Sequence, residues 1–321
     1  MTIEERVNEA NRQVLEILTK GRPRWVDVRP ALEVIPGMTP ETILMPGPSI
    51  ETERITLPLR TSICGAAIHE GLAKTKEEAW KLVEEGKIMV ASSQNYNCGN
   101  AACMVTSASM PVIVVEDSMY GGKGFAPIHP GPNPKCLRWG LYDEEVEADL
   151  SWFRSDYGPT LSQAVRASGG VDLITILSKT AGMGDENHNR QPAASMCLAL
   201  QLIPYLLEID HPQKNKIIKD FAANDRFFLH VMMAGVESLT AKCKGIELST
   251  VMVGMGGNGE EFGVQMAGTA NRWYTTKAPK IKGTFLKPSY KESDLVGYLG
   301  DSCVTEVYGL GGMSAIAGPA Y

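Results

Sequence analysis

The sequence predicts a mixed α/β (α+β) chain of several domains. We expect an α/β amino-terminal part, a helical middle and a β-rich α+β carboxyl-terminal part. In the first 120 residues or so, helical and strand-like apolar patterns alternate. Residues 141–245 carry almost only the apolar spacing of packed helices. From Ser249 onward, short apolar runs are joined by Gly and Asn, which is typical of strands and turns. These changes divide the chain into predicted domains of residues 1–140, 141–245 and 246–321.

Composition excludes several classes of protein. With 321 residues and 44% hydrophobic residues, the chain can bury a sizeable core. The net charge of −6 and the lack of a polybasic run argue against nucleic acid or an anionic membrane surface as a partner. Seven cysteines without a secretory signal predict free thiols in the cytoplasm. The apolar stretches are too short to span a bilayer.

The first predicted element is a helix. Thr2 and Glu5 form a capping box, apolar residues follow on one face, and Gly21 ends the run. A Pro-rich extended region follows, from Pro23 to Pro58.

A second helix is predicted after Thr75, which forms a cap with Glu78, and it ends at Gly86. The short apolar runs at 88–91 and 111–115 predict buried strands. Gly121–Pro134, rich in Gly and Pro, predicts a loop.

In the middle segment, apolar spacing predicts helices at 171–177, 196–207 and 217–233. Farther on, the runs at 250–253, 262–266 and 283–286 predict strands.

Gly254–Gly259 matches the G-x-G-x-x-G pattern of dinucleotide-binding proteins, but the residues that follow alternate like a strand rather than opening a helix. Asn258-Gly259 between apolar runs is a hairpin signal, and we favour the hairpin over a nucleotide site. No cofactor is predicted. Cys98 and Cys103 have no second Cys or His pair nearby, so we predict no metal site and treat the cysteines as small buried side chains.

The densest polar cluster lies between two apolar helices. Asp185 and His188 are neighbours on a helix that begins at Asp185, as are Glu186 and Arg190. A carboxylate beside an imidazole orients a general acid or base, and an Arg fork binds a carboxylate or phosphate. A helix cap with a surface ion pair explains the pattern equally well.

A second cluster contains Asp301, Ser302 and Glu306, followed by Gly311 and Gly312. A Gly-rich turn before a small apolar run can offer backbone N–H groups to an anion. A tight turn with a capped helix is the alternative.

A third, hydroxyl-rich patch contains Ser107 and Ser109 directly before a predicted strand. Loop ends beside strands of α/β proteins commonly bind ligands, although local serine turns give the same pattern.

These patches together resemble the YlbE/AllG-like family, long known as a domain of unknown function. The resemblance covers essentially the whole chain. The segments that carry it are Pro23–Pro30, Glu70-Gly71, Thr106–Pro111, Leu137–Tyr142, Met183–Arg190, Asp225–Leu229, Asn258–Gly263 with Arg272-Trp273, and Gly300–Ser302 with Thr305-Glu306 and Gly311-Gly312.

The resemblance implies a cytoplasmic bacterial protein that works in an oligomeric, multi-subunit complex with an FdrA-like partner similar to acyl-CoA synthetases. One branch is a subunit of oxamate carbamoyltransferase in allantoin breakdown, which moves a carbamoyl group between oxalurate and phosphate. It also implies α/β pieces around a helical insert. Many members carry a His-His pair where this chain has Gln94-Asn95, and a different segment where it has residues 129–134. Members usually continue beyond the position of Tyr321, so we expect the last domain to be incomplete relative to the family.

Two hypotheses of function follow. In the first, the chain is a transferase subunit: His188 is the general acid or base, oriented by Asp185 or Glu186, and Arg190 binds the small anionic substrate. The Asp301–Gly312 cluster, with Ser107 and Ser109, completes the site. In the second, the chain is a non-catalytic scaffold or regulatory subunit, as the altered 94–104 segment suggests. A nucleotide-dependent oxidoreductase is a weaker third possibility.

Overall fold

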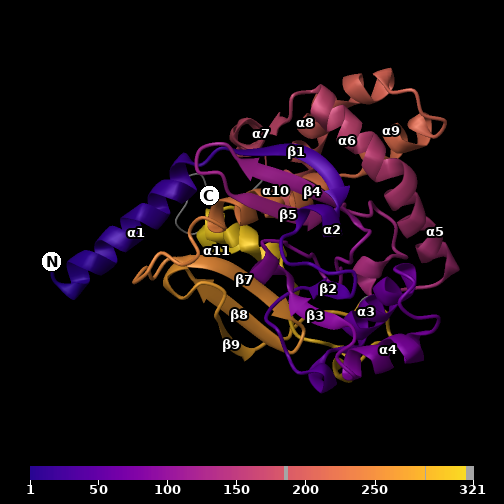
Figure 1. Ribbon diagram of the computed structural model, residues 1–321, viewed down its shortest axis with the longest axis horizontal. Helices are drawn as coiled ribbons and strands as arrows, with labels where there is room; N and C mark the ends of the chain where they lie inside the picture. The colour runs from indigo at the N-terminus through magenta and orange to yellow at the C-terminus, as the bar shows by residue number, and fades with distance from the viewer. Residues whose placement is uncertain (184–186, 286, 316–321) are drawn as a thin grey trace.

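The computed structural model describes residues 1–183, 187–285 and 287–315 (Figure 1). The described helices are α1 (Ile3–Lys20), α2 (Ala31–Val34), α3 (Leu57–His69), α4 (Lys76–Glu84), α5 (Glu144–Trp152), α6 (Gly158–Ala167), α7 (Leu173–Thr180), α8 (Asn187–Glu208), α9 (Lys214–Ala223), α10 (Phe227–Thr240) and α11 (Gly312–Ala315). The described strands are β1 (Pro23–Pro30), β2 (Thr42–Met45), β3 (Met89–Ser92), β4 (Pro111–Asp117), β5 (Lys123–Pro127), β6 (Val171–Asp172), β7 (Met252–Asn258), β8 (Glu261–Met266), β9 (Trp273–Lys277) and β10 (Leu299–Gly300).

The described strands form three sheets. One is antiparallel in the order β5-β4-β1-β6, and a second is antiparallel in the order β10-β7-β8-β9. β2 and β3 form a parallel pair. Helices α5 to α10 follow one another between β5 and β7, interrupted by the short β6. The predicted mixed α/β class with a helical middle is therefore confirmed.

Helix α10 packs directly on the first sheet, behind β4 and β5 in Figure 1. Glycines on and beside β5 permit this approach. A Cβ atom added to Gly122 would lie 1.9 Å from the Ser238 carbonyl oxygen, and one added to Gly124 would lie 2.1 Å from that of Ala234. The backbones of strand and helix are therefore in contact where a side chain would ordinarily separate them.

The largest apolar core joins this sheet to the helices around it. Trp25 of β1 and Ile113 of β4 belong to one buried cluster with Leu161 of α6 and Phe227 of α10. The Trp25 and Phe227 ring centroids are 5.7 Å apart. Strands β1, β4 and β5 of this sheet are thus buried by helices from farther along the chain.

Several local predictions are confirmed. Thr2 and Glu5 form the capping box of α1, and the Thr75 side chain accepts the Glu78 N–H at the start of α4. Figure 1 shows the amino-terminal end of α1 extending away from the rest of the fold. β7 and β8 form the predicted hairpin, with Gly259 at a φ of +88° in its turn.

Three local predictions are wrong. The segment 121–134 is not entirely loop, because residues 123–127 form β5 and pair with β4. Val171 and Asp172 are not helical, because they pair with β1 before α7 begins. Residues 283–285 form no strand, and residue 286 lies outside the described part. Within the described residues, no helix is both long and apolar enough to cross a membrane.

Candidate functional site

Asp301 is the centre of a buried polar network. Its Oδ1 accepts hydrogen bonds from Gly47 N (2.8 Å) and Gln94 Nε2 (2.7 Å). Its Oδ2 accepts from Ser93 Oγ (2.6 Å) and Asn100 N (3.0 Å). Burial raises the pKa of the Asp301 carboxyl to about 6, and these hydrogen bonds partly offset that effect. Both oxygens are therefore occupied by donors of the protein itself, and the side chain is fully buried.

Gln94 joins this network to β7. Its side-chain amide donates to the Met255 carbonyl (2.7 Å) and accepts from the Met255 N–H (3.1 Å). The glycines beside Met255 make room, since a Cβ on Gly256 would lie 2.8 Å from Gln94 Nε2. The glycine run at 254–259 thus serves close packing against Gln94 and Asp301 and the hairpin turn that follows.

Glu237 and Lys244 form a buried pair beside this network. Lys244 Nζ lies 3.7 Å from a Glu237 carboxylate oxygen and donates to the Gln94 carbonyl and to Asn97 Oδ1 (3.0 Å). Neither Glu237 oxygen has a hydrogen-bond partner among the described residues. Burial favours the neutral form of each group, raising the pKa of Glu237 and lowering that of Lys244.

This pair should make stability depend on pH. The native Glu237 carboxyl, whose pKa is raised to about 8, keeps a proton that the unfolded chain releases above the ordinary value of 4.5. The stabilisation by this group is therefore full at low pH and is lost as the pH rises toward 8. Relative to Glu237→Gln, the wild-type free energy of unfolding should fall steadily as the pH rises from about 5 to about 8. Urea denaturation across this range measures it, and parallel curves for the two proteins would contradict it.

The rest of the Asp301–Gly312 cluster also makes internal contacts. The Glu306 carboxylate accepts the Met313 N–H at 3.0 Å and lies against Gly311, where an added Cβ would be 2.0 Å from Glu306 Oε1. Ser302 is half-buried. The Glu306 carboxylate thus packs against the turn before α11.

The first predicted cluster is described only in part. Asp185 and Glu186 lie outside the described residues, and so does the side chain of His188. Arg190, in the first turn of α8, is buried and has an interaction partner. The roles predicted for these residues stay predictions.

Residues 129–134 contribute a buried histidine. His129 Nε2 lies 2.7 Å from a guanidinium nitrogen of Arg138, and the His129 ring packs edge-on against His230, with 4.8 Å between centroids. Burial lowers the pKa of both histidines, that of His230 to about 3. Both rings are therefore neutral at pH 7.

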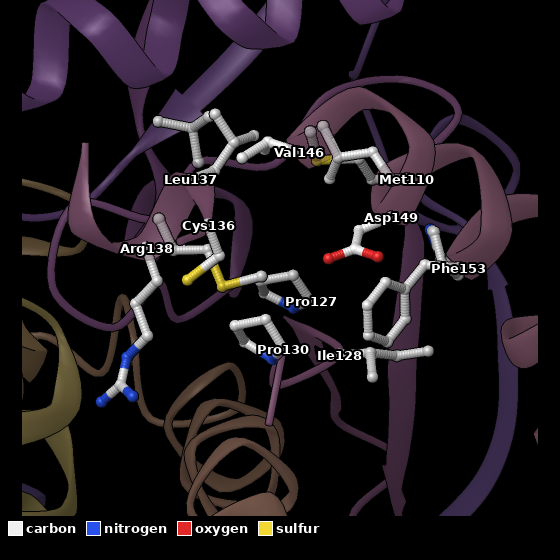
Figure 2. Close-up of a pocket in the computed structure, with 14 residues that line it drawn as sticks. Met110, Pro127, Ile128, Pro130, Cys136, Leu137, Arg138, Val146, Asp149 and Phe153 are labelled. Carbon is white, nitrogen blue, oxygen red and sulfur yellow. The ribbon is translucent and has the colours of Figure 1, made fainter. Parts of the chain in front are cut away.

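An apolar cavity of about 40 Å³ lies next to Arg138 (Figure 2). Figure 2 shows the Asp149 carboxylate facing this space, while the Arg138 guanidinium is turned away from it. Pro, Met, Leu and Val side chains make up most of the wall. A space this small holds little more than water, so it is not suited to a polar substrate.

Ser107 and Ser109 belong to a different network, built on Glu70 at the end of α3. Glu70 Oε1 accepts from Ser107 Oγ (2.5 Å), Ser109 N (2.8 Å) and Ser109 Oγ (3.1 Å). The adjacent Thr106 points the other way, because its hydroxyl donates to Asn100 in the Asp301 network (2.8 Å). The patch of Ser107 and Ser109 and the patch around Asp301 thus lie on opposite sides of the extended segment at 106–109.

A histidine and a second glutamate lie behind Ser109. Ser109 Oγ is 3.5 Å from His69 Nε2, and His69 Nδ1 is 3.0 Å from Glu147 Oε1. Tyr142 and Ser151 donate hydrogen bonds to the Glu147 carboxylate (2.9 and 3.0 Å). Burial acts to raise the pKa of Glu147, but the hydrogen bonds from His69, Tyr142 and Ser151 outweigh it and lower that pKa. The Ser109 hydroxyl, the His69 imidazole and the Glu147 carboxylate therefore form a continuous chain of contacts.

Ser109 also lines a cavity of about 260 Å³ between the end of β1 and helix α6. Three arginines, Arg29, Arg154 and Arg166, line the same cavity, together with Ser162. No acidic side chain is among the described residues of its wall.

The arginines differ in how they are held. Asp27 accepts from Ser162 Oγ (2.6 Å) and pairs with Arg166, and Arg29 pairs with Glu33. Within the described part of the chain, Arg154 makes no ion pair and is exposed. An exposed guanidinium that lines a cavity suits a carboxylate or phosphate.

Sequence reasoning identified Ser109 but not the residues around it. Glu70 and Arg29 lie in segments that carry the family resemblance, which was an available signal. No sequence signal marked His69 and Glu147 as neighbours, because they are 78 residues apart and only the packing of α3 against α5 brings them together.

The sequence of this chain is similar to those of known proteins. A family model described as "Oxamate carbamoyltransferase subunit AllG" matches residues 88–302. The uncharacterized protein YahG of Escherichia coli K12 is 33% identical over 318 residues, which cover 98% of this chain and 67% of YahG. The oxamate carbamoyltransferase subunit AllG of the same organism is 31% identical over 317 residues, which cover 98% of this chain and 75% of AllG.

A solved structure is also similar. The crystal structure of a conserved protein of unknown function from Enterococcus faecalis V583 superposes with a TM-score of 0.92 at 31% identity. The match covers 99% of this chain and 77% of that chain. Ser109, Glu147 and Asp301 lie inside the range matched by the family model, whereas Arg29 and His69 precede it.

Proposed function

Because this chain belongs to the family of the oxamate carbamoyltransferase subunit AllG, we propose that it is a subunit of a carbamoyltransferase-like complex. Its substrate is a small anion of the oxamate or oxalurate type, and its partner is an FdrA-like protein of the acyl-CoA-synthetase type. We place the complex in the cytoplasm, in line with the seven free cysteines, all of which are described.

One observation carries this proposal: three arginines and Ser109 share one cavity of about 260 Å³. Cavities that take drug-sized ligands measure about 300–1,000 Å³, so this one suits a smaller molecule. Oxamate and phosphate are small and anionic, and guanidinium forks bind both types of oxygen atom in pairs. The proposed site is therefore chemically matched to a carbamoyl acceptor and to phosphate.

The predicted His188, with Asp185 or Glu186, stays the proposed alternative acid or base of such a complex, with Arg190 as its anion-binding partner. His69 offers a second imidazole whose described contacts include a carboxylate and a hydroxyl. An assay of the co-purified complex with oxalurate and phosphate separates the two. His188→Ala and His69→Gln should have different effects, and unchanged turnover would remove the corresponding histidine from the mechanism.

The binding step is tested on this chain alone. Isothermal titration calorimetry with oxamate, and separately with inorganic phosphate, should show binding that Arg154→Ala weakens about tenfold or more, since hydrogen bonds to charged groups contribute roughly 1.5–3 kcal/mol. Arg154→Lys keeps the charge but loses the fork, and should fall in between. Arg12→Ala, on the exposed face of α1, is the matched control. Equal affinity in wild type and Arg154→Ala would refute the cavity as the anion site.

A non-catalytic scaffold is the second candidate function, and the buried position of Gln94 favours it. Where the family resemblance leads us to expect a His-His pair, Gln94 is fully engaged in hydrogen bonds that hold β7 and Asp301. If the FdrA-like partner alone shows the full activity of the complex, the scaffold is right and the catalytic proposal is wrong.

A further inference from the structure

We infer that Ser109 is a nucleophile that carries the transferred carbamoyl group as a covalent ester, with His69 as its general base and Glu147 as the residue that positions His69. This inference deepens the proposed function and rests on it for the identity of the group that is transferred. Its geometric basis is the chain of contacts from Ser109 Oγ to His69 Nε2 (3.5 Å) and from His69 Nδ1 to Glu147 (3.0 Å).

The order of these groups fixes their roles. Glu147 accepts from the Nδ1 side of His69, which leaves the Nε2 lone pair facing the Ser109 hydroxyl. A serine is activated when an imidazole in reach of its hydroxyl is oriented by a third group. The spacing of 3.5 Å is at the long end of hydrogen bonding, as is common before a substrate binds.

His69 and Ser109 differ in burial, in line with their proposed roles. The His69 side chain is fully buried, so bulk water does not compete for its nitrogens. Ser109 is only half-buried and lines the arginine cavity. The nucleophile therefore faces the space where a ligand binds, while the base acts from behind it.

Glu70 positions the nucleophile. It accepts the Ser109 N–H and the Ser107 hydroxyl, which fixes the backbone at 107–109. It also accepts the Ser109 hydroxyl at 3.1 Å, and that hydrogen bond must break before His69 takes the proton. Since Glu70 takes the Ser109 N–H, the negative charge that develops on the substrate carbonyl must be stabilised by other donors. Arg154 in the same cavity has guanidinium donors for that charge.

The chemical step balances without a further reactant. Ser109 Oγ attacks the carbamoyl carbon of the donor, and its proton passes to His69 Nε2. The bond from that carbon to the amide nitrogen of the donor breaks, and the nitrogen takes the proton from His69 and leaves as oxamate. An oxygen of hydrogen phosphate then attacks the carbamoyl ester and forms carbamoyl phosphate. The phosphate proton passes to His69 and from there to the Ser109 oxygen as the bond from that oxygen to the carbamoyl carbon breaks.

The test uses 4-nitrophenyl carbamate, an activated carbamoyl donor, on the full chain. Release of 4-nitrophenolate should reach one equivalent per chain, and tryptic mass spectrometry should place the carbamoyl group on Ser109. Ser109→Ala should abolish this modification, and His69→Gln should slow it by about 100-fold or more. Ser118→Ala, an exposed serine away from His69, should label like the wild type.

Glu147→Gln distinguishes positioning from mere stability. It should lower the maximal labelling rate while the probe concentration at half-maximal rate stays the same. Thermal melting confirms that each variant is folded, and the position of the label on the wild-type chain needs no variant. Modification only at residues other than Ser109, or equal rates in folded His69→Gln, would overturn the inference.

The two proposals fail in different ways. Protection of Ser109 by oxamate or phosphate supports both. Labelling of Ser109 without such protection, and without anion binding in calorimetry, keeps the nucleophile and refutes the proposed substrate. Anion binding without labelling of Ser109 keeps the proposed function and refutes the covalent step.

Discussion

Replacement of Asp301 by alanine is expected to lower the free energy of unfolding by about 3 kcal/mol or more, because each buried donor left without an acceptor costs roughly 1–3 kcal/mol. Four donors lose their acceptor at once: two backbone N–H groups, at Gly47 and Asn100, and the side chains of Ser93 and Gln94. All of them are buried, so water cannot replace the carboxylate without opening the structure. The effect is large because Asp301 connects segments more than 200 residues apart.

Equilibrium urea denaturation, followed by circular dichroism, measures this change. Asp294→Ala is the control, because Asp294 is exposed and makes only local contacts. Asp301→Asn keeps the volume and one acceptor oxygen, but turns its amide toward two of the four donors, so it should lose most of the same stability. A change of less than about 1 kcal/mol in Asp301→Ala would mean that the network contributes no more than an ordinary hydrogen bond.

The Asp301 network shows what the sequence predicts and what it does not. Local patterns located the hairpin at Asn258-Gly259 and the cap at Thr2, because both depend on residues two to four positions apart. The same reasoning marked Asp301 as a functional candidate from its Gly-rich surroundings. It could not show that the donors to Asp301 come from residues 47, 93, 94 and 100, since no local period encodes such pairings.

The sequence likewise predicts only part of the candidate site around Ser109. Ser107 and Ser109 stand out in the sequence because hydroxyls precede an apolar strand. The arginines of the cavity come from β1, from the segment after α5 and from α6, and each looks like an ordinary surface arginine on its own. The strand predicted as loop at 123–127 was hidden for a related reason, because its Gly and Pro residues serve contact with α10 rather than a turn.

Gly124→Ala should be the most damaging single-methyl addition in the first sheet. The added Cβ would lie 2.1 Å from the Ala234 carbonyl oxygen and 2.3 Å from the Ser238 nitrogen. Both atoms are backbone of α10, so no rotamer change can make room, and the helix must move away from β5. That movement would loosen the core in which Phe227 of α10 packs against Trp25 of β1. We expect a loss of about 3 kcal/mol or more, at the upper end of overpacking effects.

Gly283→Ala is the matched control for Gly124→Ala, because it adds the same methyl group where no atom lies within 4 Å. It should leave the urea concentration at the denaturation midpoint unchanged or slightly raised. Gly→Ala by itself slightly stabilises a chain by restricting the unfolded state, so a loss in Gly124→Ala cannot come from backbone entropy. The direction of the effect therefore reports on the contact alone. If Gly124→Ala unfolded at the same urea concentration as wild type, β5 and α10 could not be in backbone contact, and the packing of the helical segment on the first sheet would have to be different.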